Sequence, residues 1–396
     1  MSNSPIYLDN HASTRCDPRV VQAMLPYFDQ EYANPSSLHA MGRRAAQAVD
    51  AAREQVADLL GADPCDIVFT SGATESISLA LLGVLSRHRS RGDHLIVAAT
   101  EHKAVLETAY QWQAEGGKVS ILPVDRFGCV DLDDLDRAIN DHTVLVSLMA
   151  ANNEVGTLLP LDEVGRICRA RGVLFHSDAT QWVGKRSLDV GSIPVDLLSF
   201  SGHKMYGPKG IGVLYLRRPE VRLTPRQVGG GQERGLRAGT LAVPLIVGLG
   251  VACQLAQREM LAEAERLALL RDRLWQFLRD ELDGVYLNGH PTQRLPGNLN
   301  VSFDWINGAA LLLALREEVA VSTGAACTEA GGGASYVLQA MGLDKSRAEA
   351  SLRFGLGRFT TAEEIDRAAI AVVQAVRQLR ANSPLYWMRH EHEVRT

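Results

Sequence analysis

Short apolar runs alternate with helical patterns through the middle of the chain. The apolar runs, which we expect to be strands, are 67–70, 94–98, 118–122, 144–149, 173–176, 197–200 and 212–216. Between them lie a predicted helix that ends near residue 88 and three more at 103–115, 132–139 and 161–171. Continuous apolar strands that alternate with helices are typical of a mostly parallel sheet covered on both faces. The central region is therefore predicted to be α/β.

The pattern changes on both sides of this region. Ahead of it we expect an extended segment at 6–10 and two helices, 17–28 and 42–60, the second ended by Gly61. A long helix is predicted from Pro244 to about Leu282. The segments beyond it are predicted strands at 285–287, 299–303, 319–322 and 351–356, and predicted helices at 308–315, 336–341 and 362–379. We expect a large domain at 16–260, and a smaller α+β domain built from 1–15 and 261–396.

Composition and charge narrow the class of protein. The chain has 396 residues, of which 46% are hydrophobic, and a net charge of -5, which argues against a general nucleic-acid or membrane surface. No signal-peptide pattern opens it, and Pro, Gly and Gln interrupt the apolar run 241–256. No metal site is predicted. The scattered cysteines, without a C-x-x-C pair, indicate a reducing cytoplasm; they are Cys16, Cys65, Cys129, Cys168, Cys253 and Cys327.

Several candidate ligand contacts follow predicted strands. The segment 71–74 (Ser-Gly-Ala-Thr) precedes a helix, where free backbone N–H groups could bind phosphate; an ordinary capped turn is the alternative. Asp178 could pair with a protonated ring nitrogen, or cap a helix. His102 could stack on an aromatic ring, or serve as a structural hydrogen-bonding residue. Asn153 could reach a ligand oxygen.

Lys204 lies in a polar turn, 201–210, after the strand 197–200. A lysine at a strand end among small residues can lose its charge by desolvation and attack a carbonyl, although most such turns are solvated loops. The phosphate cradle, ring partner, ring-facing histidine and lysine all fall at the ends of consecutive predicted strands. Together they predict a pyridoxal phosphate enzyme.

Two further residues are candidates in the C-terminal part. Cys327 is surrounded by small residues in the segment 322–333, so its thiol can be accessible; an incidental loop cysteine is the alternative. Arg353, in the predicted strand 351–356, could bind a substrate carboxylate in a bidentate manner, or form a structural ion pair.

These residues belong to motifs that resemble those of the cysteine desulfurases of the NifS/IscS type. That family comprises pyridoxal phosphate enzymes of fold type I in the class V aminotransferase group. The likeness runs from Tyr7 to Leu385, and its markers are 69–76 (FTSGATES), 101–103 (EHK), 152–154 (NNE), 178–181 (DATQ), 201–204 (SGHK), 229–233 (GGGQE) and 237–240 (RAGT). The resemblance implies a large, mostly parallel seven-stranded sheet domain and a smaller α+β domain.

The resemblance also implies a role for each candidate. Lys204 would hold pyridoxal 5'-phosphate as a Schiff base and move protons, Asp178 would keep the ring nitrogen protonated, and His102 would stack on the ring. Cys327 would take sulfur from L-cysteine, leaving L-alanine and a persulfide for a sulfur-acceptor protein. The remaining contacts would be Asn153 and Gln181 with the cofactor; Ala73, Thr74, Ser201 and His203 with its phosphate; Thr240 with the phosphate from the partner subunit of a homodimer; and Asn34, Asn153 and Arg353 with the substrate carboxylate.

The chain departs from the family pattern in three places. His11 stands in the segment 10–14 (Asn-His-Ala-Ser-Thr), where relatives have Asn-Ala-Thr-Thr or Ser-Ala-Thr-Thr. The end of the chain, 388–396, lacks the longer tail that relatives use to dock the iron–sulfur scaffold. The loop 329–334 also differs from the usual one, which bears on the choice of sulfur acceptor.

Two other functions compete with the desulfurase. A related enzyme acting on another amino acid, such as a selenocysteine lyase or an aminotransferase, would share Lys204. An ordinary aminotransferase does not need Cys327, whereas a selenocysteine lyase uses the same lysine and cysteine and is not separated from a desulfurase by the sequence. A non-catalytic sulfur-assembly partner on the same fold would not need the combination of Lys204, Asp178, His102 and Cys327. We therefore predict a cysteine desulfurase that supplies iron–sulfur cluster or thiolation pathways.

Overall fold

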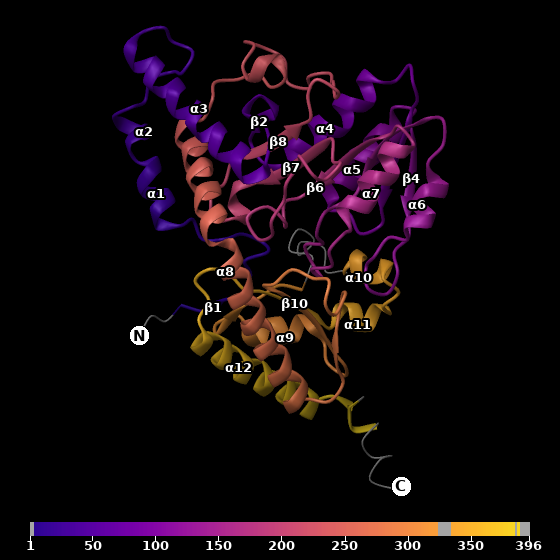
Figure 1. Ribbon diagram of the computed structural model, residues 1–396. Coiled ribbons are helices and arrows are strands. Elements are labelled where there is room, and N and C mark those ends of the chain that lie inside the picture. The colour runs from indigo at the N-terminus through magenta and orange to yellow at the C-terminus, as the bar shows by residue number, and fades with distance from the viewer. Residues whose placement is uncertain (1–3, 324–333, 385, 389–396) are drawn as a thin grey trace.

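The fold is centred on a large mixed sheet, seen in a computed structural model that describes residues 4–323, 334–384 and 386–388 (Figure 1). Within these residues its seven strands have the order β2-β8-β7-β6-β5-β3-β4. β8 is antiparallel to β2 and β7, and the other pairs are parallel, so the prediction of a mostly parallel seven-stranded sheet is confirmed. The strand bounds are β2 (Ile67–Thr70), β3 (His94–Ala98), β4 (Lys118–Leu122), β5 (Thr143–Ser147), β6 (Leu174–Asp178), β7 (Leu197–Ser201) and β8 (Gly212–Leu216).

Helices cover both faces of this sheet because side chains on successive strand residues point to opposite sides. In β2, Ile67 and Phe69 join one hydrophobic cluster while Val68 joins another. The first cluster includes α1 (Pro18–Met24), α3 (Ala40–Leu60), α6 (Leu132–Ala138), α7 (Leu161–Ala170) and the first half of α8 (Val243–Glu281). The second includes α4 (Ala73–Arg87) and α5 (Lys103–Ala114). Six of the seven strands are thus buried on both faces, as the sequence predicts, whereas the edge strand β4 is partly exposed.

A smaller layer packs around a three-stranded antiparallel sheet of order β12-β10-β9. Its strands are β9 (Val285–Leu287), β10 (Asn298–Phe303) and β12 (Ser351–Gly355). They share a hydrophobic cluster with the second half of α8, α9 (Gly308–Leu315) and α12 (Ala362–Ala381). β1 (Ile6–Tyr7) pairs in parallel with β11 (Val319–Ala320), so the N-terminal arm lies against this layer (Figure 1). The predicted domain limits stay a prediction.

The helix α8 connects the two layers. Its residues from Val243 to Met260 belong to the cluster of the large sheet, and those from Leu267 to Leu278 belong to that of the small sheet. Within the described residues it is also the one helix whose length and apolar composition match a membrane span. The core helix of a globular protein can meet the same criterion. Apolar residues of α8 are buried in the two hydrophobic clusters, so α8 is such a core helix.

The structure differs from the expected elements in a few places. The helix predicted at 17–28 is divided into α1 and α2 (Pro26–Asp29), because Pro26 has no N–H with which to continue the first helix. Only Val319 and Ala320 of the strand predicted at 319–322 form β11. The helix predicted at 336–341 is present as α10 (Tyr336–Ala340). Short helices that were not predicted are α11 (Lys345–Glu349) and the 3₁₀ turns η1 (Pro64–Asp66), η2 (Gly202–Lys204) and η3 (Glu233–Gly235).

Candidate active site

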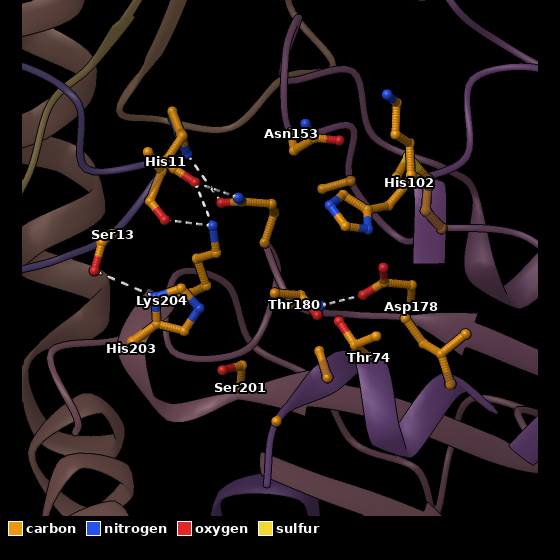
Figure 2. A pocket seen from close by; sticks show the side chains of 18 of the residues that line it. His11, Ser13, Thr74, His102, Asn153, Asp178, Thr180, Ser201, His203 and Lys204 are labelled. Atoms are coloured by element: carbon orange, nitrogen blue, oxygen red, sulfur yellow. Dashed lines mark hydrogen bonds between the residues drawn. The ribbon is translucent and has the colours of Figure 1, made fainter. Parts of the chain in front are cut away.

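A cavity of about 600 Å³ opens where the strands β3, β5, β6 and β7 end and α4 begins. Residues that follow these strands meet residues of the N-terminal arm around it (Figure 2). Arg353 of β12 also lines it. The predicted site residues in its lining are Ala73, Thr74, His102, Asn153, Asp178, Gln181, Ser201, His203, Lys204 and Arg353. The structure therefore brings together ten side chains from distant parts of the sequence.

The turn 71–74 has the features of an anion site. Gly72 precedes α4 and provides no side-chain cap, so the first N–H groups of the helix are left for a ligand. A Cβ atom at Gly212 would come within 2.5 Å of the Gly72 carbonyl carbon, which explains why glycine stands where β8 passes this turn. Of the two predicted alternatives, the geometry favours a phosphate cradle over a capped turn.

Ser201 and His203 face this end of the cavity from the end of β7 (Figure 2). The His203 ring is 3.2 Å, Nδ1 to Oγ, from Ser13 of the N-terminal arm. Burial, followed by the charge of Lys204, lowers the pKa of His203 to about 4. The imidazole is therefore neutral at physiological pH and can donate one hydrogen bond to an anion without carrying a charge. Lys209 also lines the cavity and can supply positive charge there.

Lys204 ends the 3₁₀ turn η2, and its amine points to the N-terminal arm (Figure 2). Its Nζ atom donates hydrogen bonds of 2.7 Å to the carbonyl oxygens of both His11 and Ala12. These two carbonyls hold the amine at the cavity wall. Asp178 and His102 lie across the cavity from it (Figure 2).

Asp178 and His102 each have a structural partner as well as a place in the lining. The Asp178 carboxylate accepts a hydrogen bond from the N–H of Thr180 at 3.0 Å. His102 is the N-cap of α5, and its Nδ1 atom accepts the N–H of Ala104 at 3.1 Å. Burial lowers the pKa of His102, and Asp178 opposes that shift. The ring is thus held as a neutral imidazole whose tautomer is set by the cap.

Arg353 lies on β12 and is 2% exposed. Its Nη2 atom is 2.8 Å from Oδ1 of Asp9, and its Nη1 atom donates to the carbonyl oxygen of Asn153 at 3.0 Å. The amide oxygen Oδ1 of Asn153 is buried and has no hydrogen-bond partner among the described residues. A cationic group and an amide therefore meet at this end of the cavity, where a carboxylate could accept hydrogen bonds from the guanidinium and from the amide nitrogen Nδ2 of Asn153, while Oδ1 could accept one from a donor group of a ligand.

Two predicted site residues in the described part of the chain do not line the cavity, and the position of a third is not described. Asn34 is exposed, and its side chain accepts the N–H of Ser36 at 2.9 Å. Thr240 is exposed and does not line the cavity of its own chain, and its predicted role concerns a partner subunit. Cys327 lies outside the described residues.

The cavity also contains residues that the sequence did not assign to the site. Lys103, Glu154, Thr180 and Tyr336 line it, and the Tyr336 hydroxyl donates to a backbone oxygen of the 101–103 motif at 2.6 Å. The first three lie beside a predicted site residue in the sequence, a signal that could have found them. Tyr336 gave no such signal, because only the packing of α10 brings it here.

Known proteins are similar to this chain in both sequence and fold. Residues 6–368 match the family model of class-V aminotransferases. A cysteine desulfurase of Mus musculus is 50% identical over 386 residues, which cover 97% of this chain and 84% of that protein. A cysteine desulfurase IscS of Anaeromyxobacter sp. (strain Fw109-5) is 53% identical over 389 residues, 98% of this chain and 96% of that protein.

Solved structures agree with these sequence matches. A NifS-like protein has a TM-score of 0.89 and 39% identity, covering 95% of this chain and all of that one (100%). The structure of SspA in complex with cysteine has a TM-score of 0.79 and 35% identity, covering 90% of this chain and 99% of that one.

Proposed function

Since this chain belongs to the class-V aminotransferase family and, within it, to the cysteine desulfurases, we propose that it removes sulfur from L-cysteine and leaves L-alanine and a persulfide on Cys327. The observation that carries the proposal is the meeting of Lys204, Asp178 and His102 around one cavity. Cys327 itself rests on the motif resemblance, since it lies outside the described residues.

The family uses pyridoxal 5'-phosphate, and the residues present fit this group. The uncapped first turn of α4 suits the phosphate, and Asp178, which lines the same cavity, suits the ring nitrogen. Ala73, Thr74, Ser201 and His203 would hold the phosphate, with His102 over the ring. When bound, the cofactor withdraws electrons from the substrate. Lys204 would carry the cofactor and move a proton at the substrate α-carbon.

The substrate would bind between the cofactor and β12. Arg353 would pair with its carboxylate, and Asn153 would donate a hydrogen bond to the same group. The Cys327 thiolate would then attack the substrate sulfur. An S–S bond forms as the C–S bond breaks, and the carbon keeps the electron pair and takes a proton, which yields alanine. A sulfur-acceptor protein of an iron–sulfur cluster or thiolation pathway would receive the terminal sulfur.

The proposal extends to the assembly and the location of the protein. A homodimer would place Thr240 of one subunit at the phosphate of the other, which is consistent with its exposed position outside the cavity of its own chain. A cytoplasmic location is supported by the free state of Cys16, Cys65, Cys129, Cys168 and Cys253. No membrane or nucleic-acid partner is expected.

Intact-mass analysis after mixing the protein with L-cysteine tests the proposal. The protein is expected to gain sulfur on Cys327 and to release alanine. Cys327→Ala and Lys204→Ala should show neither product. Cys65→Ala is the matched control, because it removes an exposed free thiol elsewhere and should leave both products. Alanine without sulfur on Cys327 would contradict the assigned thiol.

A further inference from the structure

Three side chains behind Lys204 form a connected group that the assigned roles leave unexplained. The Gln181 oxygen Oε1 is 2.9 Å from Nδ1 of His11 and accepts a 2.5 Å hydrogen bond from Nζ of Lys185. The Gln181 nitrogen Nε2 donates to the backbone oxygen of His11 at 3.0 Å. His11 and Gln181 are 2% and 3% exposed, so water does not compete for these contacts.

This arrangement determines which way the Gln181 amide faces. The backbone oxygen of His11 can only accept, so it requires Nε2 on that side, and the Lys185 amine requires Oε1 on the other. Turning the amide over would lose both hydrogen bonds and place donors against donors. An amide nitrogen has two N–H groups, and one of them is used here. The second is available to an oxygen atom in the cavity that Gln181 lines.

The same contacts assign the protonation of His11. Because Oε1 of Gln181 is an acceptor, Nδ1 of His11 carries the proton and Nε2 carries the lone pair. Nε2 is buried and has no hydrogen-bond partner among the described residues. Burial, followed by the charge of Lys185, lowers the pKa of His11 well below its ordinary value, which agrees with a neutral ring. Gly355 accommodates this ring, since a Cβ atom there would lie 3.1 Å from Cδ2 of His11.

We propose that His11 and Lys185 are positioning residues that hold the Gln181 amide with its second N–H turned to the ring oxygen of the cofactor. The inference rests on the proposed function, because it takes pyridoxal phosphate as the occupant of the cavity. His11 is one of the departures of this chain from the family motif, and the hydrogen bonds give that departure a role. Its imidazole and the Lys185 amine are the two donors that keep Oε1 away from the cavity.

Lys185 adds an electrostatic contribution. The charges of Lys204 and Arg353 repel its protonated amine, and the carboxylate of Glu263 attracts it. Lys185 also lines a small cavity together with His11 and Tyr206. Burial, followed by Lys204, lowers its pKa to about 7. A neutral amine still donates a hydrogen bond to Gln181, so the amide orientation is kept on both sides of this pH. Only the positive charge behind Lys204 changes.

The visible absorbance of the purified holoenzyme, titrated with pH, tests this proposal without relying on turnover. An N–H donated to the ring oxygen favours its deprotonated form. His11→Leu should therefore raise the pH midpoint of the absorbance change by about one unit, a tenfold change in proton affinity. His11→Asn keeps a donor near the place of Nδ1 and should restore the original midpoint. The thermal midpoint of each variant controls for folding.

A second comparison establishes whether the effect passes through the amide. In a Gln181→Leu background, His11→Leu should cause no further shift. Lys185→Met in the otherwise unchanged chain should also raise the pH midpoint of the absorbance change. This variant replaces His11→Leu in the test if His11→Leu does not fold. An equal shift with and without Gln181, or a failure of His11→Asn to restore the midpoint, would overturn the proposal. Persulfide formation on Cys327 is measured separately, so that the two proposals can fail independently.

Discussion

At the scale of single residues, Asp9 pairs with the buried guanidinium of Arg353, the proposed partner of the substrate carboxylate. The guanidinium is almost fully buried, and Asp9 compensates its charge at 2.8 Å. The carboxylate and the backbone oxygen of Asn153 together fix the plane of the guanidinium. A substrate carboxylate would meet a group whose orientation is already set, so little conformational entropy is lost when it binds.

We expect Asp9→Asn to raise the KM for L-cysteine about tenfold and to change kcat less. The substitution keeps the size of the side chain but removes the charge that holds Arg353. Steady-state rates of alanine release measure both constants. Asp162→Asn makes the same chemical change in an exposed ion pair, with Arg166 at 2.6 Å, and should leave both constants unaltered. An unchanged KM in Asp9→Asn would show that Arg353 needs no such partner.

For single residues, the sequence could not decide between a structural and a functional role. His102 and Asp178 each had a structural and a functional alternative, and in the structure each makes a structural hydrogen bond while lining the cavity. A local pattern cannot distinguish the two, because the same side chain can serve both. His11 was noticed as a departure, but its contact with Gln181 joins residues 170 positions apart and could not be predicted.

At the scale of elements, α12 shows how sequence signals define a helix end. Thr361 and Glu364 form a capping box, in which each side chain accepts the backbone N–H of the other residue. We expect Thr361→Ala to lower the free energy of unfolding by about 1 kcal/mol, because one N–H of the first turn loses its acceptor. Denaturant unfolding measures this change. Thr361→Ser keeps the hydroxyl and should restore most of the stability; equal losses in both variants would argue against the cap.

The predicted strands and helices are accurate where the sequence pattern that indicates them lies within the element itself. The strands 94–98 and 212–216 coincide with β3 and β8, because each is a nearly continuous apolar run, and 118–122 coincides with β4, in which Lys118 and Ser120 alternate with apolar residues. The short helix α11 was not predicted, although Asp344 caps it, because five residues are too few to show a helical period. The split of α1 from α2 follows from Pro26 and could have been expected.

At the scale of the whole molecule, buried ion pairs connect the start of the chain to its C-terminal part. Arg358 contacts Asp17, the N-cap of α1, at 2.9 Å and Glu263 of α8 at 2.8 Å. Tyr206, which follows the η2 turn, accepts the N–H of Arg358 through its hydroxyl at 2.6 Å. The cluster therefore holds the segment beside Lys204 against both layers of the fold.

We expect this cluster to make stability depend on pH in the acid range. Hydrogen bonds from Arg19, and then from Arg358, hold the pKa of Asp17 well below its usual range. A depressed folded-state pKa stabilises the fold fully above the unfolded value of about 3.9, and the contribution is lost as the pH falls from there toward the folded pKa.

Asp17→Asn keeps a capping side chain and should lower the free energy of unfolding by about 2 kcal/mol at pH 7. The difference from the unaltered protein should shrink as the pH falls below about 4. Urea unfolding at pH 7 and at pH 3 measures both values. Asp136→Asn, in an exposed pair with Arg171, is the control and should change neither. A constant difference at the two pH values would contradict the linkage.

Local pattern by itself determined most of the strands and helices, the mostly parallel sheet, and the alignment of Asp178, His102 and Lys204 with strand ends. These follow from hydrophobic period and turn chemistry, which act over a few residues, and parallel strands then bring their ends to one edge of the sheet. The motifs identified the family and the cofactor.

Only the tertiary structure decided how the cavity is completed. The N-terminal arm brings the backbone of His11 and Ala12 to Lys204, β12 places Arg353 opposite the sheet, and α10 adds Tyr336. Each of these contacts depends on the packing of segments far apart in the chain, and no local pattern records such packing. The direction of the Gln181 amide was decided in the same way, by hydrogen-bond partners that only the folded chain brings together.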